Sequence, residues 1–146
     1  MNNPETKFNP NKLTFEQGLE RIEKAVKAEG LDTKKIVTSR DAKASKLREV
    51  LMTKNVPGGF MKWQLPVALQ CQSQMFISVG APNTKVPKHS HDDGPGLRFI
   101  GAGSILYNGK ELTAGDWMYI PKGEPYSFEV GPLGATMFYC YCCCCA

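Results

Sequence analysis

The sequence contains only two histidines, and it lacks any apolar run approaching the roughly 20 residues that span a bilayer. Its first residues show neither the basic segment nor the apolar segment of a secretory signal. Five of its six cysteines lie within the last seven residues, which leaves Cys71 as the single distant partner and does not suit a disulfide framework. We therefore expect a cytoplasmic protein in a reducing compartment, with no membrane partner.

Positive charge is concentrated in the first part of the chain. Residues 1–56 carry twelve Lys and Arg against eight Asp and Glu, a net +4, whereas residues 57–146 carry six of each. A basic segment can bind nucleic acid, but here the Lys residues alternate with Glu at helical spacing. This pattern favours a solvated helix surface, and we expect no nucleic-acid partner.

Two helices are predicted in residues 1–56, which we interpret as a helical extension. Thr14 and Gln17 form a capping box, and Gly30 is a plausible stop for the helix that follows. A second helix is predicted from Asp41 to Lys54. An apolar stripe marks the buried side of the first helix: Phe15, Leu19, Ile22 and Val26.

The pattern changes at Pro57, after which short β-type segments alternate with Gly, Pro and Asn. The strongest hairpin signal is Asn108-Gly109. Many short strands at regular spacing indicate a sandwich or barrel, so we expect a β domain over residues 57–146. The predicted strands are Met61–Leu65, Cys71–Val79, Lys88–His91, Leu97–Ala102, Ser104–Tyr107, Trp117–Ile120, Tyr126–Val130 and Ala135–Cys142.

The two histidines form the tripeptide His89-Ser90-His91. On a strand, residues i and i+2 point to the same face, so both imidazoles would project side by side. Farther along, Gly115 is followed by five residues, then Pro121, one residue and Gly123.

Together these motifs resemble the two motifs of the cupin superfamily, over roughly residues 75–139. The resemblance implies a mainly β fold: an RmlC-like, antiparallel jelly-roll barrel, here preceded by two N-terminal α-helices. It also implies a cavity that binds a small molecule. Cupin barrels often dimerise, and the amphipathic helices offer a surface, so we expect a homodimer.

The sequence departs from the cupin pattern at two metal-ligand positions. The position of the family's Glu is Gly96, and the position of its third His is Tyr126. The resemblance implies one divalent transition metal (Fe, Mn, Ni, Cu or Zn) bound by His89 and His91, with Tyr126 as third ligand or catalytic proton donor. Asp92, Asp93 or water could complete the set. The alternative is a metal-free cavity whose histidines hydrogen-bond a ligand.

Arg98 lies two residues after Gly96, so it shares the inward face if Gly96 points inward. It could bind the carboxylate of a substrate in bidentate geometry. Alternatively, it forms an internal salt bridge with Asp92, Asp93 or Glu129, or it faces water. Phe128 shares a face with Tyr126 and is a candidate wall of the substrate site.

The C-terminal cysteines, Cys140 and Cys142 to Cys145, allow three interpretations: a soft-metal or redox site, a peptide presented to a modifying enzyme, or a tail without a role. Three functions follow for the protein. It is a metal-dependent cupin enzyme such as a dioxygenase, a non-catalytic cupin that binds a ligand or metal, or a folded carrier for the cysteine-rich peptide.

Overall fold

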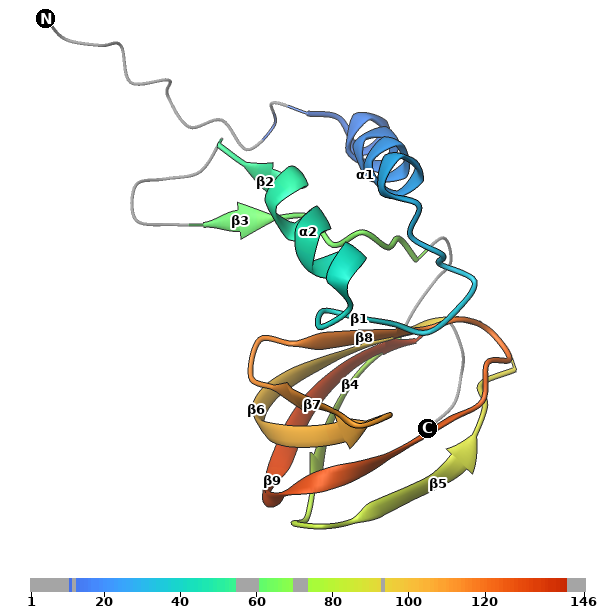
Figure 1. Cartoon of the computed structure of the whole chain (residues 1–146), viewed down its shortest axis with the longest axis vertical. Coiled ribbons are helices and arrows are strands. Elements are labelled where there is room, and N and C mark those ends of the chain that lie inside the picture. The colour runs from blue at the N-terminus through green and yellow to red at the C-terminus, as the bar shows by residue number, and fades with distance from the viewer. Residues whose placement is uncertain (1–10, 12, 55–60, 70–73, 93, 142–146) are drawn as a thin grey trace, which may run out of the picture. The chain divides into compact units, whose positions relative to one another are not determined.

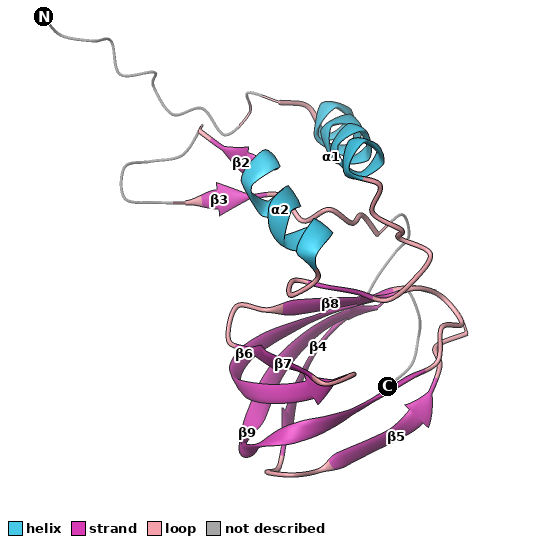
Figure 2. Cartoon of the chain, in the orientation of Figure 1, coloured by secondary structure: helices cyan, strands magenta, loops and turns pink. Residues whose placement is uncertain are grey.

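The computed structural model describes residues 11, 13–54, 61–69, 74–92 and 94–141. The chain forms two compact units, a helical unit of residues 1–31 and 42–68 and a β unit of residues 32–41 and 69–146. Figure 2 shows that both helices belong to the helical unit. The predicted boundary at Pro57 lies outside the described residues. The chain passes between the two units at residues 31–32, 41–42 and 68–69.

Helix α1 (Phe15–Glu29) begins and ends where its sequence signals predicted. The Gln17 N–H donates to the Thr14 hydroxyl at 3.2 Å, and the Thr14 N–H donates to the Gln17 side chain at 2.9 Å. These bonds satisfy backbone donors that the first turn leaves without partners. Gly30 closes the helix with φ +67°, a conformation that suits glycine. No helix in the described ranges is long and apolar enough to cross a membrane.

Helix α2 (Ala42–Val50) is shorter than predicted, because the chain turns at Leu51 into strand β2 (Met52–Thr53). Strand β2 pairs with β3 (Lys62–Trp63), and the Gln64 N–H donates to the Leu51 carbonyl at 3.1 Å. This pairing ends the helix, so the prediction that it reaches Lys54 was wrong. The predicted strand Met61–Leu65 is only two residues long, and it belongs to the helical unit.

The β unit contains a seven-stranded antiparallel sheet. Its strands follow the order β1-β8-β6-β9-β4, with β5 added on β9 and β7 on β6 (Figure 1). The predicted mainly β, antiparallel architecture with two helices near the N-terminus is therefore confirmed. The strands are β1 (Val37–Thr38), β4 (Gln74–Gly80), β5 (Lys85–His89), β6 (Gly96–Tyr107), β7 (Lys110–Thr113), β8 (Trp117–Ile120) and β9 (Tyr126–Tyr141).

Strands β6 and β9 are each continuous, although the sequence predicted two shorter strands in place of each. Their mutual register shifts on both sides of Gly103, which has φ +69°. A Cβ at Gly103 would lie 2.0 Å from the Gly134 carbonyl oxygen, so only glycine allows the two strands to pass this closely. The glycines that appeared to be breaks in the sequence instead allow long strands to bend.

The predicted hairpin at Asn108-Gly109 is confirmed. Both residues have positive φ, +48° and +74°, and Tyr107 pairs with Lys110 across the turn. Two left-handed residues match the turn to the twist of the flanking strands β6 and β7.

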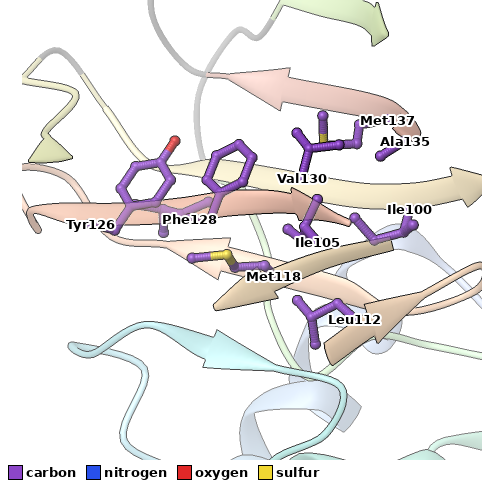
Figure 3. Close-up of a cluster of buried hydrophobic side chains, with 10 residues drawn as sticks. Ile100, Ile105, Leu112, Met118, Tyr126, Phe128, Val130, Ala135 and Met137 are labelled. Atoms are coloured by element: carbon purple, nitrogen blue, oxygen red, sulfur yellow. The ribbon is translucent and has the colours of Figure 1, made fainter. Parts of the chain in front are cut away.

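A single apolar cluster fills the space between the strands of the β unit. Figure 3 shows side chains from β6, β7, β8 and β9 converging in it. Met118 and Ile120 alternate inward from β8, and Tyr126, Phe128 and Val130 do so from β9, as the period of two requires. Tyr126 belongs to this core and also lines a neighbouring cavity of the β unit.

Candidate functional site

A cavity of about 340 Å³ opens in the β unit. Its walls come from β4, β5, β6 and β9, with one further residue just after β5. The lining residues are Phe76, Ile77, Ser78, Val86, His89, His91, Arg98, Tyr126, Phe128, Tyr139 and Tyr141.

All five residues that the sequence singled out line this cavity: His89, His91, Arg98, Tyr126 and Phe128. The two histidines do not lie on one strand, as the sequence had predicted, because β5 ends at His89 and His91 lies beyond it. His91 is held instead by its backbone carbonyl, which accepts the Gly123 N–H at 2.8 Å. That bond joins the His89-Ser90-His91 segment to the turn of the second motif.

The two imidazoles lie edge to face, with ring centroids 5.2 Å apart. His89 Nδ1 is 2.8 Å from the carbonyl oxygen of Pro87, and His91 Nε2 is 3.2 Å from the Tyr126 hydroxyl. Burial lowers the pKa of His91, and His89 and Arg98 lower it further, while Asp92 opposes them. A neutral His91 is therefore favoured, so that Nε2 can accept the proton of the Tyr126 hydroxyl.

Arg98 and two tyrosines form a hydrogen-bonded cluster in the wall of the cavity. Arg98 Nη2 donates to the Tyr126 hydroxyl at 3.1 Å and to the Tyr141 hydroxyl at 3.3 Å. The two hydroxyls are themselves 3.1 Å apart. Through Tyr126, the cluster continues to His91, so that cation, phenols and imidazole form one connected network.

Aromatic rings enclose the Arg98 guanidinium. Its central carbon lies 3.6 Å from the Tyr139 ring centroid and 4.6 Å from that of Phe128. Arg98 Nη1 donates to the Met137 sulfur at 3.4 Å, whereas the buried Nε has no hydrogen-bond partner among the residues that the structure describes. Arg98 is only 3% exposed, which excludes the alternative that it faces water.

The guanidinium has no carboxylate partner among the described residues. The ion pairs of the described ranges join other residues, and neither Asp92 nor Glu129 pairs with Arg98. Asp93 lies outside those ranges. Burial lowers the pKa of Arg98, and burial raises the pKa of Tyr141, which keeps that phenol neutral rather than a counter-ion. The cluster thus holds a buried cation whose hydrogen-bond acceptors are all uncharged.

Tyr141 and Tyr139 are site residues that the sequence analysis missed. Tyr141 is the one that hydrogen-bonds to Arg98. It pairs with Gly96 across β6 and β9, and a Cβ at Gly96 would lie 1.9 Å from the Tyr141 ring. The ring therefore occupies the space next to the position where the cupin resemblance places a Glu ligand. The glycine at position 96 was a signal for a close neighbour, but the sequence alone did not identify which residue it was.

The cavity presents the imidazoles of His89 and His91, whereas Gly96 and Tyr126 stand where the cupin resemblance places a Glu and a third His. The described residues include no group of three or more His, Cys, Asp or Glu side chains arranged to hold a metal ion. The hydroxyl of Tyr126, the third predicted ligand, is already bonded to Arg98 and Tyr141. A guanidinium one hydrogen bond away also disfavours a second cation.

No family model and no curated protein sequence matches the chain. Matching solved structures include a protein of unknown function with a cupin-like fold from Ralstonia eutropha, at 21% identity and a TM-score of 0.44. That match covers 49% of this chain, and the chain spans 47% of the other protein's length.

The chain is also similar to two solved cupin structures. A cupin protein from Bacteroides fragilis matches at 24% identity over 53% of this chain and 67% of its own, with a TM-score of 0.40. An RmlC-like cupin from Shewanella frigidimarina matches at 19% identity over 47% of this chain and 64% of its own, with a TM-score of 0.41. The likeness is one of fold, and the roles of the cavity residues depend on their own geometry.

Proposed function

We propose that the β unit binds a small molecule that carries a carboxylate and an apolar body, with Arg98 as the anchor of the carboxylate. One observation carries the proposal: the Arg98 guanidinium is buried in the cavity wall, and within the described part of the chain it has no carboxylate partner and its Nε has no hydrogen bond.

Burial of an unpaired cation is costly, by an effective several kcal/mol even after the surroundings relax. The phenols of Tyr126 and Tyr141 compensate only in part, because neutral acceptors bind a cation less strongly than a carboxylate does. A bound carboxylate would supply the missing negative charge. The site therefore has a larger electrostatic gain from an anionic ligand than from a neutral one.

The rest of the cavity suits an apolar or aromatic body. Val86, Phe128 and Tyr139 present carbon surface around the guanidinium. The volume lies at the lower end of the range of about 300–1,000 Å³ that is common for ligand pockets. His89 and His91 add hydrogen-bonding groups that could select among ligands by their polar substituents.

Isothermal titration calorimetry of the full chain with matched carboxylate and amide pairs tests the proposal. The probes are acetate and acetamide, benzoate and benzamide, and indole-3-acetate and its amide. We expect at least one carboxylate to bind at least tenfold more tightly than its amide. Equal affinities within every pair, or no carboxylate binding at all, would contradict the proposal.

Substitution of the anchor gives a second arm of the same experiment. Arg98→Lys keeps a charge but loses the planar fork, so we expect carboxylate affinity to fall about tenfold. Arg48→Lys is the matched control, because Arg48 is exposed and contacts Trp63 of the helical unit. A carboxylate that binds both variants as well as the wild type would rule out Arg98 as its anchor.

A metal-dependent cupin enzyme is the second candidate function, favoured by the two imidazoles in one cavity. If His89 donates from Nδ1 to Pro87, its Nε2 carries the lone pair that a metal would require. Among the described residues, no third His, Cys, Asp or Glu joins the two imidazoles to complete a donor set. Elemental analysis of the full chain with Cys142 to Cys145 replaced by Ser, compared with the same chain carrying His89→Ala, decides whether this cavity holds one.

A further inference from the structure

The β unit presents an apolar face on strand β4. Met75, Ile77 and Val79 alternate outward along β4 and are 80%, 70% and 77% exposed. Phe138, which pairs with Ile77 from β9, is 41% exposed on the same side. Isolated exposed apolar residues are common in soluble proteins, but several adjacent ones mark an interaction surface.

A groove of small residues extends this face at the Val79 end. It is lined by Val79, Leu133 and Thr136, among others, and Leu133 is 90% exposed. Val79 and Thr136 are paired across β4 and β9, so the groove continues directly from the strand face. We call Met75, Ile77, Val79, Leu133 and Phe138 together the β4 face.

We propose that the β4 face is the contact between two copies of this chain, packed face to face about a two-fold axis. The face is suited to bind itself, because a two-fold contact places the same patch on both partners and this patch contains no ionisable side chain. Two copies can therefore meet without like-charge repulsion. Flat apolar sheet surfaces pack well on each other at about 10 Å separation.

The size of the patch agrees with a second copy as the occupant. Five large side chains with these exposures offer roughly 600 Å² per copy, and a standard interface buries about 800 Å² per partner. Flanking polar atoms of β4 and β9 would supply the remainder as a rim.

Most of the β4 face lies apart from the proposed ligand site, and Ile77 is the one residue of this face that also lines the cavity. Phe76 and Ser78, which alternate with the β4 face along the strand, line the cavity as well. This alternation lets β4 contribute one side to the cavity and the other to a partner. The position also differs from the amphipathic helices that the sequence analysis offered as a dimer surface.

The mass of the full chain in solution, measured by light scattering after gel filtration under reducing conditions, tests this inference. We expect a wild-type dimer and an Ile77→Lys monomer, since a buried lysine would be desolvated in the contact. Leu106→Lys is the matched control, because Leu106 is 43% exposed on β6 and lies outside the β4 face. Ile77→Leu should remain dimeric. Circular dichroism of each variant confirms that it is folded.

Each alternative outcome overturns the proposal. A wild-type monomer means that another partner, or another part of this chain, covers the β4 face. A dimer that survives both Ile77→Lys and Val79→Lys uses a different surface. Equal dissociation by Leu106→Lys would show that the effect is not specific to this face. If Ile77→Lys does not fold, the exposed Val79→Lys variant carries the test.

Discussion

At the scale of single residues, Arg98 is a buried cation of the β unit whose Nε has no hydrogen-bond partner in the part of the chain that the structure describes. It is enclosed by the Tyr139 and Phe128 rings, and its hydrogen bonds reach only neutral acceptors. A residue that served stability alone would be better replaced there by an apolar side chain of similar length. The free energy of unfolding that Arg98 costs the β unit therefore indicates that this residue has a role other than stability.

We predict that Arg98→Met leaves the free energy of unfolding unchanged or raises it by about 1–4 kcal/mol, because it removes a buried cation that lacks a counter-ion. Urea unfolding of the two proteins measures the difference, and the same preparation should no longer discriminate carboxylates from amides. A loss of about 3–5 kcal/mol would instead indicate that the guanidinium is paired in the folded chain.

The sequence predicted some of these cavity residues and missed others, for a physical reason. Alternation along a strand is a local property, so the inward direction of Arg98 followed from its distance of two residues from Gly96. The Tyr141 ring reaches Gly96 across a ladder that joins residues 45 positions apart. No local pattern encodes that register, because it depends on how the whole of β9 bends past Gly103.

At the scale of elements, the two-residue strand β1 is held by contacts to residues far along the chain. Strand β1 pairs with β8, and Ser39 and Arg40, which follow β1, both donate to the Asp116 carboxylate. The Thr113 N–H donates to the same carboxylate. A two-residue strand has few ladder bonds, so this carboxylate is its main attachment to the turn before β8.

Asp116 should make the stability of the β unit dependent on pH. Burial alone would raise its pKa, but the bonds from Thr113, Ser39 and Arg40 outweigh burial, and the pKa is lowered from 3.8. Since the folded pKa lies below the unfolded one, the stabilisation is present above about pH 4 and is lost as the pH falls through the folded pKa.

We therefore predict that the wild type loses more stability between pH 6 and pH 3 than Asp116→Asn does. Urea unfolding at a series of pH values measures the two slopes. Glu111→Gln, an exposed carboxylate on β7, is the control and should keep the wild-type slope. Parallel curves for wild type and Asp116→Asn would contradict this explanation.

At the scale of the whole molecule, the two units alternate along the chain rather than follow each other. Residues 32–41 contribute β1 to the β unit, although they lie between the two helices in the sequence. Composition and periodicity could predict helices first and strands later, since both are local signals. They could not predict that two residues between the helices join a strand some 80 positions away, because only the assembled sheet offers them an edge.

Ligand binding should stabilise the whole chain, and this linkage separates the two candidate functions. A ligand that binds only the folded state stabilises it by about 2.7 kcal/mol at a concentration 100 times its Kd. We predict that the best carboxylate of the matched pairs raises the unfolding temperature of the wild type equally with and without a chelator, and that it has no effect on Arg98→Met. His89→Ala should retain most of the shift, because among the described residues His89 forms no hydrogen bond with the Arg98 cluster and its Nδ1 lies 2.8 Å from the Pro87 carbonyl oxygen. Two results would instead assign the cavity to a metal-dependent function: a shift that disappears on chelation, or a shift that is lost with His89→Ala but kept with Arg98→Met. In either case the carboxylate would bind through an ion held by the imidazoles rather than through the guanidinium.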